Sequence, residues 1–330
     1  MELTAGENDD GRRLDRILRR ALPDHPLPLI HRLLRQGKVL VNGKPAKAQD
    51  RICCGAKIFI PVIREQAIGG RHQKEIGASK IPDILWEGLG LIAVNKEAGI
   101  SVHGNNSLDT LVRSYLADKL PPSLSFTPGP LHRLDKPTSG VVVFSENIKG
   151  ARLFSSLMRE RKVKKTYLAV IEGALEKEEI WQDELVRDKE KKKTFILNKI
   201  NDKNKIDNAP VLRTAITKVT PLASDKKLTL VKAEITTGRT HQIRAQAASH
   251  GYPLFGDIKY GSEIRNEKYG MRNFKKVDIF LHAWKIEFLD YLIEAPLPQT
   301  WIPMASRIAS TNVLRSGSLP DIPGISTSSG

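Results

Sequence analysis

The sequence predicts an α+β protein with two parts: a small N-terminal α/β domain, and a larger core in which helices pack on a mixed, largely antiparallel sheet. Three observations support this prediction. Apolar residues recur at helical spacing near the N-terminus and lead into an Asn-Gly hairpin signal at 42–43. A polar, Gly-containing segment without periodicity covers 63–82 and is typical of a linker. Strand-like and helical stretches then alternate over 83–308.

The first part, residues 12–62, is strongly basic, because twelve Lys and Arg residues stand against three Asp residues and give a net charge of +9. Its apolar spacing predicts two short helices, of which the second ends at Gly37. KVLVNGKPA at 38–46 alternates into the Asn-Gly turn, and GAKIFIP at 55–61 predicts a closing strand. We therefore expect a compact helix-helix-hairpin unit.

The second part, residues 83–308, is predicted from its apolar patterns. We expect strands at 90–95, 140–145, 166–172, 211–219, 228–236 and 279–287, and helices near 108–118, 147–159 and 240–250. The last stretch, 309–330, is rich in Ser, Gly and Pro and lacks an apolar face, so it predicts a disordered tail. The sequence contains no internal repeat.

Composition narrows the class of protein. A net charge of +16 and a pI near 9.8 favour a polyanionic partner, since Lys and Arg arrays displace the counterions condensed on phosphates. The two cysteines are adjacent, which disfavours a structural disulfide and suggests a reducing compartment. There is no apolar run of membrane-spanning length, and the acidic N-terminus excludes a secretory signal. We expect a cytoplasmic protein that does not enter membranes.

The stretch HRLDKPTSG at 132–140, which runs into an apolar VVVF segment, carries the clearest chemical signal. It sets Asp135 on a tight loop that contains Pro and Gly, with Arg133 two residues before it and a buried strand behind it. Reactive groups tend to lie on loops that a rigid scaffold positions. On its own, the same pattern is also typical of a solvated turn in which Asp bonds its own backbone.

This motif resembles the signature of the RluA-type family of RNA pseudouridine synthases. Four further segments match in the family's order: LGLIAVNKEAGISVHG at 89–104, KVKKTYLAVIEG at 162–173, TGRTHQIRAQAASHGYPLFGDIKYG at 237–261, and LHAWKIEF at 281–288. The resemblance covers roughly residues 85–305 and implies an α+β pseudouridine-synthase core.

The N-terminal part resembles the S-four RNA-binding domain in Arg13-Leu14-Asp15, in Gly37-Lys38-Val39, around Asn42-Gly43 and at Gly55. One departure is that Pro26-Leu27 stands where a Ser-Arg pair usually opens the second helix, so one expected phosphate contact is missing. The residues expected to bind RNA are Arg13, Arg16, Arg32, Arg35, Lys38 and Lys44. The charged segment 187–195 is expected to be an exposed hairpin tip that faces RNA or only solvent.

The resemblance implies isomerisation of uridine to pseudouridine, a reaction that needs no redox cofactor, nucleotide or metal. The sequence has no phosphate loop, no dinucleotide fingerprint and no zinc-type Cys/His spacing. The family implies that Asp135 either attacks ribose carbon 1′ or removes a proton from carbon 2′, and that Arg244 pairs with it. A nearby guanidinium favours a charged carboxylate. Tyr167 is expected to stack on the uracil and to remove the carbon 5 proton.

The other site residues are expected around these three. By family analogy, Arg133 fills the gap that the extruded uridine leaves. His132 is expected to support the loop, and His241 and Gln242 to fix Arg244. Leu134 and Ile243, together with His103, complete the expected substrate-binding set: Arg133, His132, Leu134, His103 and Ile243.

Several alternatives stay open at the level of sequence. The S-four-like domain favours structured RNA, with large-subunit ribosomal RNA as the expected substrate and transfer RNA as the alternative. A non-catalytic RNA-binding factor for ribosome assembly could keep the fold, but it would not need Asp135, Tyr167 and Arg244 together. An RNA methyltransferase would need a glycine-rich cofactor loop, for which GLGL at 88–91 is a poor match. We expect a monomer, and the sequence does not indicate which uridines are modified.

Overall fold

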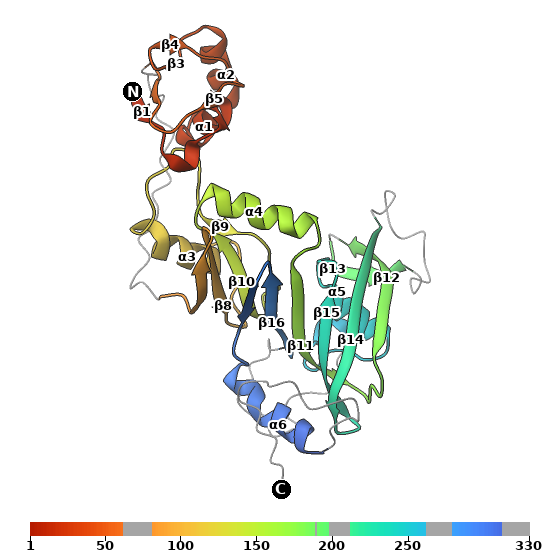
Figure 1. Cartoon of the computed structure of the whole chain (residues 1–330). Helices are drawn as coiled ribbons and strands as arrows, with labels where there is room; N and C mark the ends of the chain where they lie inside the picture. The colour runs from red at the N-terminus through yellow and green to blue at the C-terminus, as the bar shows by residue number, and fades with distance from the viewer. Residues whose placement is uncertain (62–80, 189, 198–211, 262–278, 312–330) are drawn as a thin grey trace.

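The computed structural model describes residues 1–61, 81–188, 190–197, 212–261 and 279–311. Figure 1 shows a small N-terminal unit above a larger unit built on a long curved sheet. The predicted α+β class with a mixed, largely antiparallel sheet is confirmed. None of the helices in these ranges is long and apolar enough to span a membrane.

The N-terminal unit contains two helices packed on a small sheet with strand order β1-β6-β3-β4. Its elements are β1 (Glu2–Thr4), η1 (Glu7–Asp9), β2 (Arg12–Arg13), α1 (Leu14–Ala21), α2 (Leu27–Arg35), β3 (Leu40–Val41), β4 (Lys44–Pro45), β5 (Arg51–Ile52) and β6 (Lys57–Phe59). Asn42 and Gly43 both have positive φ, at 48° and 77°. This is the backbone that a two-residue hairpin turn requires, so the predicted hairpin is present.

The predicted start of this domain at residue 12 is too late. Strand β1 pairs with β6 along Glu2 to Thr4, and Ala5 lies in the domain's core. The acidic N-terminus hid this strand, because only Leu3 of the three strand residues is apolar.

The larger unit is built on a sheet whose described strands follow the order β13-β12-β14-β15-β11-β16-β10-β8-β7, with β17 paired to β16 and β9 paired to β10. Their bounds are β7 (Ile84–Gly88), β8 (Leu91–Lys96), β9 (Gly129–Pro130), β10 (Ser139–Ser145), β11 (Lys164–Glu172), β12 (Glu179–Asp188), β13 (Lys193–Ile196), β14 (Arg213–Ser224), β15 (Leu228–Ile235), β16 (Leu281–Phe288) and β17 (Tyr291–Glu294). The β10–β16 pair is parallel, and the other described pairs are antiparallel.

Helices cover both faces of this sheet. They are α3 (Leu108–Ala117), α4 (Ile148–Arg159), α5 (Gln242–Ser249) and α6 (Ile302–Thr311), with short turns η4 (Ile258–Tyr260) and η6 (Gln299–Trp301). Side chains alternate between the faces, so that Val142 and Phe144 pack with residues of α3 while Val141 and Val143 pack with residues of α4. The core therefore has two layers, and α5 lies in the same layer as α3.

Two predicted boundaries of this unit need comment. Helix α6 runs to Thr311, three residues into the segment predicted as a tail, and Ala309 is buried in the core beside Trp301. The prediction was wrong there because the short apolar stripe of α6 adjoins a Ser- and Gly-rich sequence. The rest of the predicted tail, 312–330, and residues 63–80 of the predicted linker lie outside the described ranges. The predicted hairpin around 187–195 is the turn between β12 and β13, apart from residue 189, which is not described.

Candidate active site

Asp135 lies on the loop between β9 and β10, close to the point where β10 runs parallel to β16. The amide of Thr138 donates to the carbonyl of Asp135 over 3.1 Å, which closes a tight turn. Gly140 follows with a φ of 111°, and a Cβ atom there would lie 2.1 Å from the carbonyl oxygen of Ala283. Only glycine fits this close approach, so the TSG part of the motif fixes where the loop leaves the sheet.

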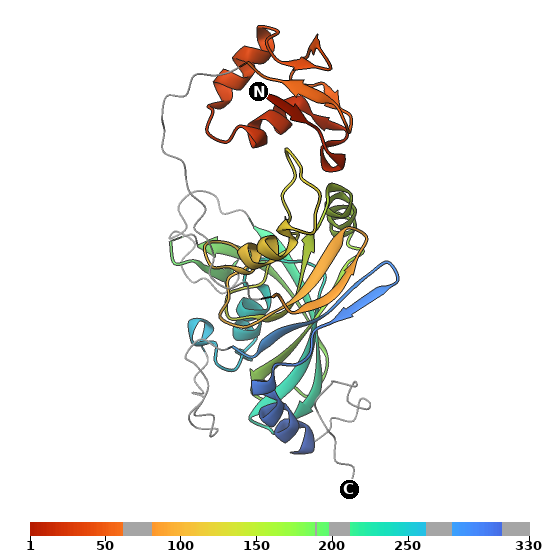
Figure 2. The same cartoon turned by 90° about the vertical axis from the view of Figure 1, so that its left-hand side faces the viewer.

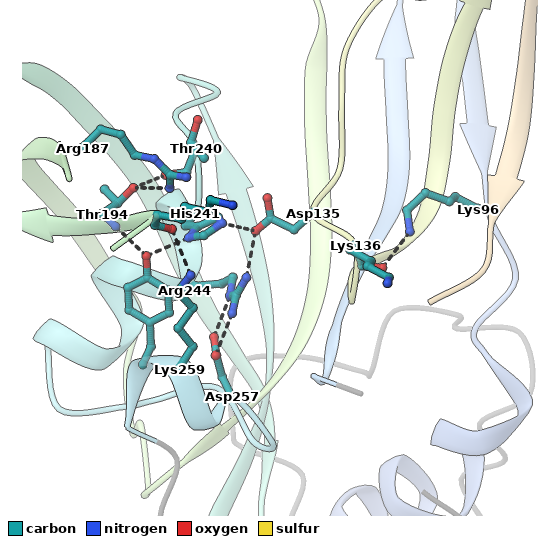
Figure 3. A network of polar contacts seen from close by, with 12 residues as sticks. Lys96, Asp135, Lys136, Arg187, Thr194, Thr240, His241, Arg244, Asp257 and Lys259 are labelled. Carbon is teal, nitrogen blue, oxygen red and sulfur yellow. Dashed lines mark hydrogen bonds and ion pairs between the residues drawn. The ribbon is translucent and has the colours of Figure 1, made fainter. Parts of the chain in front are cut away.

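Lys96 fixes the position of the same loop. Its side chain is fully buried, and Nζ donates to the carbonyls of Glu97, Ile100 and Lys136 over 2.9, 2.8 and 3.1 Å. Burial lowers the pKa of Lys96 to about 8, against the attraction of Asp135 and Glu97, which raises it. The ammonium therefore ties the Asp135 loop to the loop after β8 (Figure 3).

Arg244 lies on α5 and reaches Asp135 from the opposite side of the site (Figure 3). Its Nη1 donates to Asp135 Oδ2 over 3.2 Å. Its Nε and Nη2 donate to the two carboxylate oxygens of Asp257 over 2.7 and 2.8 Å, a bidentate pair that fixes the guanidinium plane. Burial lowers the pKa of Arg244, but the bonds to Asp257 and the charges of both carboxylates outweigh it and raise that pKa. Arg244 is thus a permanently charged partner of Asp135.

His241, which directly precedes α5, also faces Asp135. It has a left-handed φ of 54°, and its Nε2 lies 3.7 Å from Asp135 Oδ2. Its Nδ1 lies 2.8 Å from the hydroxyl of Tyr260. Burial lowers the pKa of His241 to about 4, although Asp135 acts in the opposite direction. The imidazole is therefore neutral near pH 7, and the contact with Asp135 is a polar contact and not an ion pair.

Tyr167 lies on β11 beside a β-bulge opposite β16 and is only 8 % exposed. Burial, and then the charge of Asp135, raise the pKa of its hydroxyl. The hydroxyl therefore stays protonated and can donate a hydrogen bond.

These groups surround one pocket. Its lining combines charged and polar groups with an apolar floor, and consists of Arg133, Leu134, Asp135, Thr138, Tyr167, Ile235, Arg239, His241, Gln242, Ile243, Arg244 and Leu281. Arg133 is exposed at the rim, whereas Leu134 and Ile243 are buried. The buried hydroxyl of Thr138 has no hydrogen-bond partner among the described residues.

The structure thus brings most of the predicted site residues together. Asp135, Tyr167, Arg244, Arg133, Leu134 and Ile243 all line the pocket. His132 does not: its Nε2 accepts from the amide of Val143, and its ring stacks on Phe154. Burial and the charge of Lys165 lower the pKa of His132 to about 3, so it supports the loop as a neutral group.

His103 is not among the residues that line the pocket: it is more than half exposed, and its Nδ1 lies 3.9 Å from Asp109. Its predicted part in substrate binding stays a prediction. Gln242 does not fix Arg244 but holds its own loop, since Oε1 accepts from Thr237 and from the amide of Arg239. His241 contacts Asp135. Among the described residues, no hydrogen bond or ion pair joins the His241 side chain to Arg244.

Asp257, Tyr260 and Lys96 were missed as site residues. Asp257 and Tyr260 stand in the GDIKYG stretch that ended the recognised segment 237–261, so the pattern was visible but its geometry was not. The sequence alone does not indicate that Asp257, thirteen positions after Arg244, accepts hydrogen bonds from its guanidinium.

The N-terminal residues predicted to bind RNA are all exposed: Arg13, Arg16, Arg32, Arg35, Lys38 and Lys44. Only Arg13 has an ion pair with a described residue, to Asp15 over 2.8 Å. Cys53 and Cys54 are both free and exposed. The described residues include no group of three or more His, Cys, Asp or Glu that could hold a metal ion.

Comparison with known proteins agrees with this geometry. The sequence model of the RNA pseudouridylate synthase family matches residues 90–249, and that of the S4 domain matches residues 12–58. "Ribosomal large subunit pseudouridine synthase C" of Pasteurella multocida is 32 % identical over 87 % of this chain and 85 % of its own length. The protein of the same name from Rickettsia bellii is 32 % identical over 87 % of this chain and 94 % of its own.

Among solved structures, human RNA pseudouridylate synthase domain containing 4 is similar in fold. It has a TM-score of 0.55 at 21 % identity and covers 68 % of this chain and 92 % of its own. Human RNA pseudouridylate synthase domain containing 1 gives the same TM-score and identity over 75 % of this chain and its whole length. Taken with the pocket around Asp135, these similarities show that the chain belongs to the RNA pseudouridylate synthase family and carries an N-terminal S4 domain.

Proposed function

We propose that this enzyme isomerises uridines of large-subunit ribosomal RNA, with Asp135 as the group that acts on the ribose. The choice of RNA is supported by the names of its relatives, which are ribosomal large subunit pseudouridine synthases. The S4 domain and the net charge of +16 support a structured polyanion as substrate. We further propose that the chain acts as a monomer in the cytoplasm.

One observation carries the assignment of Asp135: its carboxylate is only half satisfied. Oδ2 faces Arg244 and His241, whereas no described residue bonds Oδ1. Its side chain keeps 15 % of its surface exposed, and that surface opens into the pocket. A carboxylate that is held in place through one oxygen and open at the other is suited to act on a substrate. Attack on carbon 1′ and removal of a carbon 2′ proton both fit this arrangement.

The rest of the pocket is suited to a uracil ring. Leu134 and Ile243 supply apolar surface, and the Tyr167 ring can stack on a base. The unpaired hydroxyl of Thr138 and the protonated hydroxyl of Tyr167 can bond the polar edge of the base or the sugar. Arg133 at the rim can occupy the place that the extruded nucleotide leaves.

The reaction balances without a co-reactant. The bond between nitrogen 1 and carbon 1′ breaks, the base turns, and carbon 5 bonds to carbon 1′. Nitrogen 1 gains a proton, and carbon 5 loses one to solvent. Release of the carbon 5 hydrogen is therefore a direct measure of turnover.

The test is tritium release from RNA labelled at uracil carbon 5, with unmodified large-subunit ribosomal RNA and transfer RNA transcripts. We expect release from the ribosomal transcript with the native chain. Asp135→Asn should lower the rate by at least about 10²–10⁴-fold while RNA binding is kept, because shape and charge are retained. Asp290→Asn, at the exposed turn after β16, is the matched control and should match the native rate.

Other outcomes separate the alternatives. Release from transfer RNA alone would show that the proposed substrate is wrong. Normal release by Asp135→Asn would exclude Asp135 as the reacting group. Tight binding of both RNAs with no release from either would favour a non-catalytic factor.

A further inference from the structure

A buried carboxylate lies at the centre of the contact between the N-terminal domain and the catalytic domain. Asp9 of η1 is fully buried. Its oxygens accept from the hydroxyls of Ser123 and Ser125 and from the amides of Leu124 and Ser125, all in the segment after α3. The amide of Gly6 in its own domain is a further donor. Figure 2 shows this segment of the catalytic domain rising to meet the N-terminal domain.

Other contacts extend the junction on both sides. Asn8 Oδ1 accepts from the amide of Ile148 at the start of α4 over 2.9 Å. Arg20 donates to the hydroxyl of Thr127 over 2.8 Å. Leu124 packs against the core of the N-terminal domain. The docking thus combines hydrogen bonds and apolar contact, and it uses no arginine to neutralise Asp9.

Arginines from both domains gather at this junction. Arg12 of β2 and Arg16 and Arg20 of α1 follow at four-residue spacing, and Arg152 lies on α4, whose first residue contacts Asn8. Burial lowers the pKa of Arg12, which Asp9 opposes, and the charges of Arg152, Arg16 and Arg20 lower it further. The positive charges are therefore close enough to repel one another.

The attraction of Asp9 offsets part of this repulsion at Arg12. Among the described residues, none of the four arginines has a carboxylate within ion-pair distance. Like charges one helical turn apart, such as Arg16 and Arg20, destabilise a helix. A cluster of this kind gains stability when a polyanion neutralises it.

We propose that Arg12, Arg16, Arg20 and Arg152 form one composite surface that binds the backbone of the RNA where it crosses from the S4 domain to the catalytic domain, and that the Asp9 junction assembles this surface. The inference rests on the proposed function, in that the RNA is taken to be the substrate. A surface made by two domains in a fixed relation would also hold the S4-bound RNA at a set position relative to the pocket.

The test measures how the affinity for an unmodified large-subunit ribosomal RNA transcript depends on salt, and compares the native chain with its variants. Each phosphate contact contributes about 0.7–0.9 to the slope of log Kd against log salt. We expect Arg16→Gln and Arg152→Gln each to lower the slope by that amount and to weaken binding several-fold at low salt. The control is Lys227→Gln at the exposed β14–β15 turn, beside Asp225, which pairs with Arg307 of α6. Figure 1 places α6 at the opposite end of the molecule from the S4 domain, so Lys227→Gln should keep the native slope.

The role of the junction is tested by repeating the Arg152 comparison in an undocked background. Asp9→Asn is one such background, and Ser123→Ala with Ser125→Ala is a second that leaves the N-terminal domain itself unchanged. We expect the loss of slope at Arg152 to disappear in either background, since α4 would no longer adjoin the S4-bound RNA. Arg16→Gln should keep its effect there.

Three results would overturn the inference. An unchanged slope in Arg152→Gln would confine RNA binding to the S4 domain. An unchanged slope in Arg16→Gln as well would point to another class of partner for this patch. An Arg152 effect that persists in both undocked backgrounds would show that the junction does not assemble the surface. Each result is separable from failure of the proposed function, which is measured by tritium release and by Asp135→Asn.

Discussion

Two aspartates of this protein are held in opposite ways. Asp9, at the domain junction, is fully buried and surrounded by neutral donors that occupy both of its oxygens. Asp135, in the pocket, is bonded at Oδ2 by a guanidinium, and no described residue bonds Oδ1. The first carboxylate is saturated, and the second is positioned but incomplete.

The difference explains what each site can do. Buried polar groups in proteins are almost always fully hydrogen-bonded, so a saturated carboxylate such as Asp9 is a structural element. A charged group left partly unsatisfied costs stability and is kept where it serves chemistry. The neutral cage of Asp9 also leaves the nearby arginines without a carboxylate partner, whereas Asp135 and Asp257 both engage Arg244.

The largest effect should come from changing the partner of Asp135. In Arg244→Lys the charge remains, but one ammonium cannot bond both oxygens of Asp257 and also Asp135. We expect kcat for tritium release to fall by about 10²–10³-fold, as when one preorganised donor is removed from an active site. KM should change much less.

The control for that change is Arg159→Lys at the exposed end of α4, which should keep the native kcat. Thermal unfolding separates the two explanations of a loss. A fold that melts close to the native temperature with a low kcat supports positioning of Asp135. A collapse of the melting temperature in Arg244→Lys would show that the Arg244–Asp257 pair serves mainly to hold the fold.

Asp9→Asn should break the saturated site. Asparagine has one acceptor oxygen, and its amino group would face either the amides of Gly6 and Leu124 or the donors of Ser123 and Ser125. We expect docking to weaken by about 1.5–3 kcal/mol, the range for hydrogen bonds to a charged group. Cys53 and Cys54 are the chain's two cysteines, so Cys54→Ser with Lys177→Cys leaves one cysteine for a dye in each domain. Resonance energy transfer between the two dyes then measures docking, and it should fall in Asp9→Asn.

The same assay tests the pH dependence of docking. Burial would raise the pKa of Asp9, but the hydrogen bonds from Ser125, Leu124, Gly6 and Ser123 outweigh it, so that pKa is lowered. A lowered pKa means that the contribution of Asp9 is fully present above the usual aspartate value of about 3.9 and is lost as the pH falls further. Energy transfer should thus stay constant from neutral pH to about pH 4. Glu7→Gln, at an exposed neighbour, should behave as the native chain, and undocking already at pH 6 would exclude Asp9 as the latch.

The sequence predicted the sheet and most of its helices, and it singled out Asp135, Tyr167 and Arg244, which line one pocket. It could do so because apolar periodicity and the HRLDKPTSG and GRTHQIR motifs are local signals. It did not predict what depends on return of the chain from a distance. Arg244 and Asp257 become neighbours only in the folded chain, and Asp9 bonds Ser125, which lies 116 positions away in the sequence. His103 stands inside a matching motif, yet it is not among the residues that line the pocket.

The smallest expected effect sharpens the description of Asp135, through the tautomer of His241. The amide of Thr194 donates to the Tyr260 oxygen, and that hydroxyl lies 2.8 Å from His241 Nδ1. We expect the tyrosine hydroxyl to donate to Nδ1, which places the hydrogen of His241 on Nε2, 3.7 Å from Asp135. In that tautomer the neutral imidazole directs its N–H toward the Asp135 carboxylate.

Tyr260→Phe removes the hydroxyl but keeps the ring that lies over the guanidinium of Arg244. We expect the activation free energy to rise by about 1 kcal/mol, which lowers kcat roughly five-fold, because the imidazole is no longer held as the Nε2–H form.

Nitrogen NMR of His241 should show a mixture of tautomers in the variant and a single tautomer in the native chain. Because burial lowers the pKa of His241 to about 4, the native signal should stay constant from neutral pH to about pH 5. Tyr291→Phe on β17, whose ring packs on Trp86, is the matched control. A single Nε2–H tautomer in Tyr260→Phe, with an unchanged kcat, would show that the Tyr260 hydroxyl does not orient His241.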